Sequence, residues 1–148
     1  MNADVTLIHQ FLDNGGQPLA LTASPLQQML KGKILQIDPK LGRSTLAFEP
    51  GLEFLQGGGV VQGGIVTTML DYAMAFAALA RIPEDMSVGS ATLTVNFMKA
   101  AAPGLLIASG TVVRMGSRIV FAEAQIGPDA ANPIATATTV MAVFPLKK

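Results

Sequence analysis

The sequence predicts an α+β fold in which a curved antiparallel sheet covers one buried helix. Residues 65–80, IVTTMLDYAMAFAALA, are apolar on nearly every face of a helix, so another layer of the protein must enclose them. Four later segments rich in Val, Ile, Thr and Phe have the composition of strands. They are residues 87–99, 105–115, 118–126 and 133–144. These strands supply the layer that the helix needs.

The four segments are expected to pair in chain order. They are separated by Pro103-Gly104, by Gly116-Ser117 and by residues 127–133, and connections this short favour antiparallel neighbours. The first segment also alternates with a period of two, which is typical of a strand. Its two alternating sets are Ala91, Leu93, Val95 and Phe97 against Thr92, Thr94, Asn96 and Met98. We therefore predict a four-stranded meander.

The first half of the chain predicts two helical segments and two further strands. Residues 3–14 place apolar side chains on one helical face and end at Asn14-Gly15-Gly16, and Ser24-Pro25 begins another helical turn. Lys33 to Asp38 and Arg43 to Phe48 have the pattern of strands. We expect residues 1–148 to form a single domain with a short N-terminal helical extension, at about residues 1–30.

Composition excludes several classes of function. Ten basic residues balance ten acidic residues, so no overall field favours nucleic acid or an anionic membrane as a partner. The chain has no cysteine and one histidine, His9. These counts exclude a disulfide, a thiolate nucleophile and a multi-histidine metal site, and they argue against a serine–histidine triad. No metal or cofactor is expected.

The balance of apolar and charged residues predicts self-association. Half of the residues are hydrophobic and only 14% are charged, which leaves little polar surface for an isolated chain of 148 residues. The longest apolar stretch, residues 65–80, is shorter than the roughly 20 residues that span a bilayer, and it contains Asp71. The N-terminus lacks the features of a signal peptide. We expect a cytoplasmic protein with no membrane partner.

Asp71 is the carboxylate of the apolar helix. Helical spacing places Gly64, Thr67 or Thr68, Asp71 and Ala75 along one small, polar side. A carboxylate in such a helix is costly to bury without a partner, and groups of this kind often act as general bases or nucleophiles. The alternative is that Asp71 is structural and is bonded to the backbone or to an arginine.

Two further segments are candidates for ligand contact. Gln62-Gly63-Gly64 stands where the helix begins, so its free N–H groups can bind an oxyanion, although two glycines before a helix are also common in ordinary loops. The segment matches neither a P-loop nor a dinucleotide-binding fingerprint. Arg114 and Arg118 flank a tight turn and can hold a phosphate or simply be solvated.

The segments QGGGVVQGGIVTTMLD, SATLTVNFMKAAAPG and VVRMGSRIVFAEA together resemble the phenylacetate-degradation (PaaI-like) hotdog thioesterases. The resemblance covers roughly residues 43–144. It implies a hotdog fold, hydrolysis of an acyl-coenzyme A (acyl-CoA) thioester, and a homodimer that pairs into a dimer of dimers.

The resemblance also implies roles for individual residues. Asp71 matches the general base or nucleophile, and the Gly63 N–H matches the donor that polarises the thioester carbonyl. Gln56 matches an amide that places the attacking group, and Ser90 matches a hydroxyl that contacts it. The expected substrate and CoA contacts are Gly64, Thr68, Phe97, Arg114, Gly116, Ser117 and Arg118.

Gln62 departs from the family pattern, which has histidine at this position. Glutamine can still donate a hydrogen bond towards the carbonyl and so help Gly63 to stabilise the oxyanion, but it cannot become a cation near neutral pH. A non-catalytic acyl-CoA binding or sensing protein is therefore the main alternative, and a dehydratase fits less well because His9 is badly placed. Gly63 and Asp71 are eight residues apart, about 12 Å along one helix. If both act on one substrate, they must come from different subunits.

Overall fold

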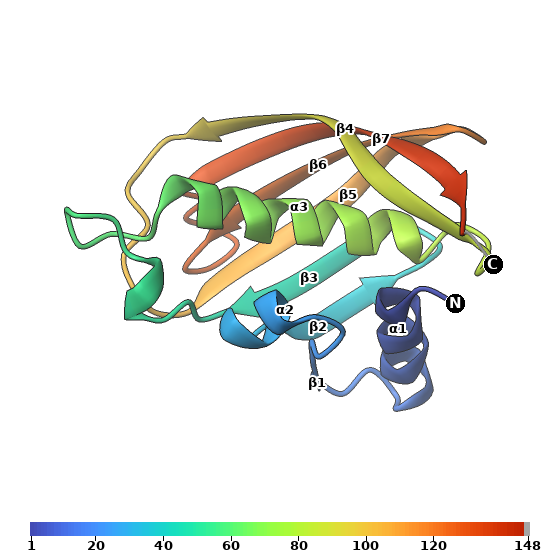
Figure 1. Cartoon of the computed structure of the whole chain (residues 1–148), viewed down its shortest axis with the longest axis horizontal. Coiled ribbons are helices and arrows are strands. Elements are labelled where there is room, and N and C mark those ends of the chain that lie inside the picture. The colour runs from blue at the N-terminus through green and yellow to red at the C-terminus, as the bar shows by residue number, and fades with distance from the viewer. Residues whose placement is uncertain (147–148) are drawn as a thin grey trace.

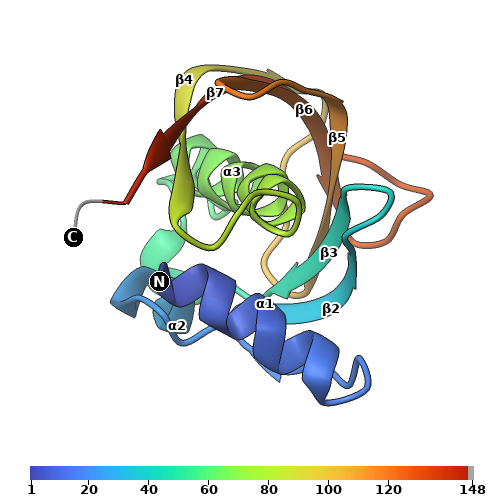
Figure 2. The same cartoon turned by 90° about the vertical axis from the view of Figure 1, so that its right-hand side faces the viewer.

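Helix α3 (Gly63–Leu79) is the element around which the other elements are arranged. In the computed structural model, which describes residues 1–146, a seven-stranded antiparallel sheet curves around this helix. Figure 2 looks almost along α3 and shows the sheet enclosing it on most sides. Met69, Leu70, Ala73 and Met74 are completely buried against the sheet. The predicted α+β hotdog fold is confirmed.

The remaining helical and extended elements agree closely with the expected ones. The helical elements are α1 (Ala3–Asp13), α2 (Pro25–Met29) and the short 3-10 helix η1 (Leu52–Phe54). The strands are β1 (Leu19–Ala20), β2 (Lys33–Asp38), β3 (Arg43–Phe48), β4 (Met86–Phe97), β5 (Leu106–Met115), β6 (Ile119–Gly127) and β7 (Ala135–Pro145). Only β1 and η1, each two or three residues long, were not expected.

The strand order corrects the predicted four-stranded meander. The order in the sheet is β1-β2-β3-β5-β6-β7-β4, so β5, β6 and β7 do pair consecutively but β4 does not pair with β5. Instead, β3 pairs with β5, and β4 pairs with β7 at the far edge (Figure 1). The physical reason is the curvature of the sheet around α3. A strand that covers the far side of the helix must join the sheet at its free edge.

Helix α3 lies directly against the sheet at a cross-strand pair formed by Ser44 of β3 and Gly110 of β5. A β-carbon at Gly110 would overlap the carbonyl group of Ala73 in α3. The buried hydroxyl of Ser44 donates to the Ala73 carbonyl oxygen at 2.6 Å. The absence of a side chain at Gly110 and the hydrogen bond from Ser44 therefore determine how close α3 lies to the sheet.

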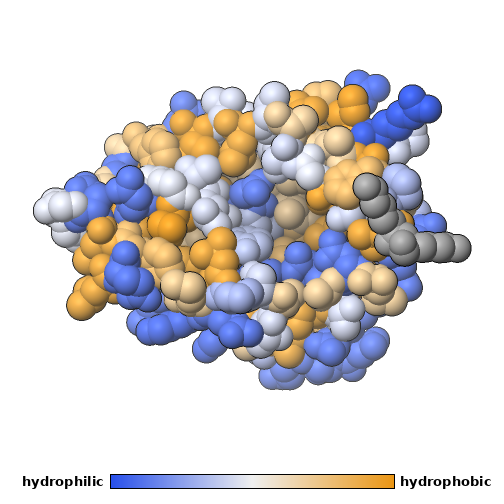
Figure 3. All heavy atoms as spheres, viewed as in Figure 1, coloured by the Kyte–Doolittle hydropathy of each residue, from blue (hydrophilic) through white to orange (hydrophobic). Residues whose placement is uncertain are grey.

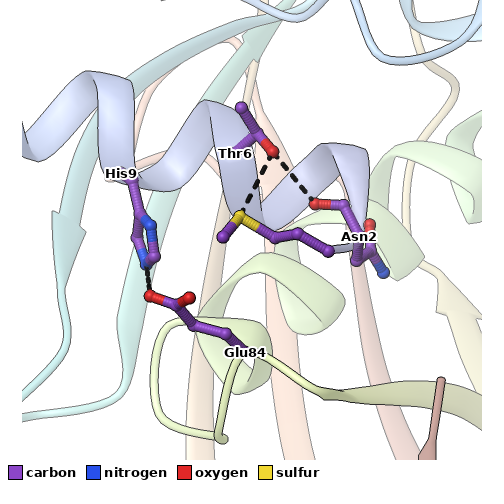
Figure 4. A network of polar contacts seen from close by, with 5 residues as sticks. Asn2, Thr6, His9 and Glu84 are labelled. Carbon is purple, nitrogen blue, oxygen red and sulfur yellow. Dashed lines mark hydrogen bonds and ion pairs between the residues drawn. The ribbon is translucent and has the colours of Figure 1, made fainter. Parts of the chain in front are cut away.

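The N-terminal segment packs on the end of this core. Helix α1 buries Val5, Leu7, Ile8 and Phe11. Asn2 caps α1 by accepting from the Asp4 N–H at 2.9 Å and donates its side-chain amide to the Ser87 hydroxyl at 3.0 Å. His9 lies 3.6 Å from Glu84, which follows α3 (Figure 4). Across residues 1–146, no helix combines the length and apolarity needed to cross a membrane.

We predict that Gly110→Ala destabilises the fold by about 1–3 kcal/mol, because the added methyl group must push α3 away from β5. Urea unfolding at one fixed protein concentration measures the change in free energy. Gly57→Ala is the matched control, because nothing lies within 4 Å of a β-carbon there. Equal stability of the two variants would contradict the close approach at Gly110.

Candidate active site

One stripe of α3 is left only partly covered by the sheet. It follows the small, polar side expected from the sequence and consists of Gly64, Thr67, Thr68, Asp71, Tyr72 and Ala75. Asp71 of this stripe bonds to Ser90 of β4, and the Tyr72 hydroxyl lies 3.4 Å from the hydroxyl of Ser24, the N-cap residue of α2. On the same face, Figure 3 shows pale and blue residues between two orange, apolar areas. The only carboxylate of the helix is therefore accessible from outside the core.

Asp71 is paired with a hydroxyl group across the gap between α3 and β4. The Ser90 hydroxyl donates to Oδ1 of Asp71 at 2.6 Å. Between residues 1 and 146, the one ion pair within 4.0 Å is His9–Glu84, so Asp71 is not neutralised by an arginine. The same part of the chain contains no cluster of three metal-ligating side chains. Asp71 thus keeps one oxygen, Oδ2, free of this bond for a water or a substrate atom.

The first turn of α3 presents free N–H donors beside the exposed side chain of Gln62. Gln62 is the N-cap residue, and its exposed side chain makes no capping bond. The N–H groups of Gly63 and Gly64 belong to the first turn, so they have no acceptor inside the helix. The hydroxyls of Thr67 and Thr68 donate back to the carbonyls of Gly63 and Gly64 at 2.9 Å. Thr68 therefore has no hydroxyl proton to offer a ligand in this arrangement.

A cavity of about 390 Å³ opens beside Gly63. Its apolar lining includes Val61, Val66 and Phe97, and the Phe97 ring lies 3.4 Å from the place where a β-carbon of Gly63 would stand. Gln56 also lines the cavity, while its Oε1 accepts from the Gly58 N–H and closes a turn. Lys99 is the charged residue of the lining and was not predicted. The sequence signal for Lys99 was its spacing from Phe97, because residues two apart in an extended segment lie on the same face.

The arginine turn lies at the other end of the molecule. Arg114, Gly116, Ser117 and Arg118 are all exposed, and the Gly116 N–H closes the hairpin by donating to the Ile119 carbonyl at 2.8 Å. The ten residues of β5 span about 30 Å and carry the chain from the N-terminal end of α3 towards its C-terminal end (Figure 1). The hairpin and Gly63 therefore cannot contact the same small group within one chain.

The predicted site residues thus form three groups in one chain. Gln56, Gly63 and Phe97 surround the cavity at the start of α3. Asp71 and Ser90 meet near the middle of the helix, about 12 Å further along. The arginine hairpin lies beyond them, towards the end of the helix.

The thioesterase superfamily profile matches residues 58–127, the part of the chain that contains Gly63, Asp71, Ser90 and the arginine hairpin. A protein of Saccharolobus solfataricus assigned as an esterase is 28% identical over 101 residues, which cover 68% of this chain and 70% of the relative. A second protein assigned as an esterase, from Halobacterium salinarum, is 38% identical over 72 residues, about half (47%) of each chain.

Solved structures show the same fold over nearly the whole chain. A phenylacetic acid degradation-related protein from Ralstonia eutropha, assigned as a thioesterase, is 25% identical with a TM-score of 0.77, covering 90% of this chain and 97% of its own. A thioesterase family protein from Silicibacter pomeroyi is 23% identical with a TM-score of 0.79, covering 97% and 99%. The E. coli PaaI protein is 16% identical with a TM-score of 0.76, covering 96% and 94%.

The profile match includes the segments that form the candidate site, and the fold is that of known thioesterases. Residues 58–127 therefore resemble the thioesterase superfamily in sequence, and the chain resembles these solved structures in fold over nearly its whole length.

Proposed function

We propose that the protein hydrolyses an acyl-CoA thioester to the free acid and coenzyme A. The match of residues 58–127 to the thioesterase superfamily supports thioester hydrolysis in general. The observation that carries the assignment of Asp71 is its bond with Ser90 on the uncovered stripe of α3. Asp71 is only partly buried there and keeps Oδ2 free of this bond, so a substrate or a water can reach the carboxylate.

In the proposed reaction, Asp71 either attacks the thioester carbon or removes a proton from the water that attacks it. The Ser90 hydroxyl holds one carboxylate oxygen, which directs the other towards the carbonyl carbon. The Gly63 N–H, at the positive end of α3, stabilises the oxyanion that forms. The carbon–sulfur bond then breaks, and the departing thiolate takes up a proton to give free coenzyme A. If water was the attacking group, the acid is released directly. If Asp71 was the attacking group, a water then hydrolyses the Asp71 anhydride, which releases the acid and restores the carboxylate.

One chain cannot bring Gly63 and Asp71 to the same substrate. They are about 12 Å apart along α3, whereas both must lie within about 3–3.5 Å of the reacting atoms. We therefore infer a homodimer in which each site combines Gly63 of one subunit with Asp71 and Ser90 of the other.

The surface around α3 supports such a dimer. Strand β4 has an unpaired edge of 12 residues, and edges of this length are usually covered. The exposed apolar residues of this region include Met29 of α2, Leu52 of η1, Phe97 at the end of β4, and Met98. If two α3 helices run antiparallel across a two-fold axis, the arginine hairpin of one subunit approaches Gly63 of the other. Arg114 and Arg118 can then bind coenzyme A phosphates.

Gln62 supports a second candidate function. Its side chain is uncharged and exposed beside Gly63, where the family pattern has histidine, so the same site can bind an acyl-CoA without hydrolysing it. Thiol release from a panel of acyl-CoA substrates tests the first function, because a binding protein shows affinity without turnover.

Replacing Asp71 with Asn is expected to lower kcat by roughly 10²-fold or more, because the amide can neither attack nor accept a proton. Thiol release measures the rate. Asp13→Asn, at an exposed acid near the end of α1, is the control and should keep the wild-type rate. Turnover near the wild-type level in Asp71→Asn would exclude Asp71 as the catalytic group.

Arg118→Ala is expected to weaken coenzyme A binding roughly tenfold at low salt, because a charge-assisted bond to phosphate is lost. Arg114→Ala should have a smaller effect, and both effects should shrink as salt is added. Calorimetric titration with coenzyme A measures the affinity, and Arg43→Ala on β3 is the control. Unchanged affinity for coenzyme A in both hairpin variants would show that Arg114 and Arg118 are solvated and do not bind this ligand.

The shared site predicts recovery of activity in mixed dimers. One inactive variant carries Asp71→Asn. The other carries Gly63→Val, whose branched side chain adds bulk beside the Phe97 ring and is expected to keep the substrate carbonyl away from the oxyanion donor. In a mixed dimer, one site contains both substitutions, and the other site contains the unchanged Gly63 and the unchanged Asp71. Random pairing makes half of the dimers mixed, so co-refolding should restore roughly a quarter of wild-type activity.

The two variants mixed without unfolding are the control for this experiment. Native mass spectrometry verifies that mixed dimers form. If verified mixed dimers are no more active than the two parent variants, Gly63 and Asp71 do not act across an interface.

A further inference from the structure

Ser90 and Phe97 on β4 point to the same side of the sheet, although their spacing in a regular strand would place them on opposite sides. Side chains alternate along a regular strand, so residues an odd number apart face opposite ways. Ser90 and Phe97 are seven residues apart. Yet Ser90 bonds to Asp71 of α3, and Phe97 packs over Gly63 of the same helix. Something in β4 must reverse the alternation between them.

The reversal is a β-bulge. Thr92 pairs with Val140 of β7, but Ser90 pairs with Met141, so Ala91 has no residue opposite it. From Ser90 to Phe97, β4 advances seven residues while β7 runs back only six, from Met141 to Ala135. Met141 and Ala135 are both buried on the inner face of β7. Their partners Ser90 and Phe97 therefore both face α3.

Thr139 holds the strand at this irregularity. It lies on the inner face of β7, two residues before Met141, and its side chain is 4% exposed. Its hydroxyl donates to the carbonyl oxygen of Thr92 at 2.7 Å, at the residue where the register resumes. Because a bulge interrupts the ladder of backbone hydrogen bonds, a side-chain donor at this point stabilises the bulged conformation over a regular one.

A regular strand would turn Ser90 away from the site. If Ala91 paired with Met141, Ser90 would face Ala142, which lies on the outer side of the sheet. Asp71 would then lose its hydroxyl donor and its fixed orientation. Bulges are known to redirect side chains near active sites.

We propose that Thr139 is a positioning residue, which fixes the bulge at Ala91 and thereby aims Ser90 at Asp71. The proposal rests on the proposed function of Asp71 and Ser90. The hydroxyl of Thr139 donates to the Thr92 carbonyl and not to Asp71, so we expect its effect on the rate to pass through Ser90.

The test is a double-mutant cycle on Thr139 and Ser90, read as kcat and KM for acyl-CoA hydrolysis. Thr139→Val keeps the shape of the side chain but removes the donor. It should lower kcat about tenfold with little change in KM, since displacement of a reacting group by 1 Å can cost about 10²-fold. Thr139→Ser keeps the donor and should retain the wild-type kcat. In Ser90→Ala protein, adding Thr139→Val should lower kcat no further.

Thr138→Val is the matched control, because Thr138 is the exposed neighbour on the outer face of β7. A wild-type kcat in Thr139→Val, or independent losses from Thr139→Val and Ser90→Ala, would overturn the proposal. Loss of function in Thr139→Ser equal to that in Thr139→Val would also overturn it. Wild-type rates in both Asp71→Asn and Ser90→Ala would instead refute the proposed function.

Deletion of Ala91 provides a second test that applies even if Thr139→Val alone does not fold. Because Ser90 pairs with Met141 and Thr92 with Val140, we expect β4 to become regular without Ala91 and to keep both pairings. The shortened chain should be active, and Thr139→Val within it should leave kcat unchanged. A tenfold loss of kcat in that background would show that Thr139 acts in some other way.

Discussion

The burial of α3 is the constraint on which the rest of the structure depends. A 17-residue helix with this many apolar side chains is stable in water only when it is enclosed. One sheet encloses most of it by curving, with β3 and β5 on one side of the helix and β4 on the opposite side (Figure 2). The curvature explains why β4 leaves its neighbour in sequence and joins β7 at the edge of the sheet.

The same enclosure leaves an opening where chemistry is possible. The sheet ends at β4, and the stripe of α3 next to this edge carries Asp71 and two threonines. The N-terminus of the helix also presents free N–H groups beside a cavity. Polar groups that would be costly inside the core are therefore gathered where the core is incomplete. A second subunit that covers this edge would complete both the apolar layer and the proposed site.

Local departures from regular strand structure set the direction of the candidate site side chains and the position of α3. Ala91 in β4 reverses the alternation between Ser90 and Phe97. A similar bulge in β5 leaves Val113 without a partner and pairs Arg114 with Phe121, on the outer face of the sheet. Gly110 allows α3 to lie directly on the backbone of β5. Each irregularity occurs where a regular strand would place a side chain on the wrong side or create a clash.

Hydrophobic periodicity and composition were sufficient to predict the fold class, the main helices and strands, and the polar side of α3 that carries Asp71. These features depend on patterns within 10–20 consecutive residues. The pairing of β4 with β7 was not predictable, because it depends on how the sheet closes around the helix. The contact between Ser90 and Asp71 came only from a family resemblance, since simple alternation assigns Ser90 and Phe97 to opposite faces. The bulge that brings both to one face involves a hydroxyl group 47 residues from its acceptor, so only the tertiary structure decided it.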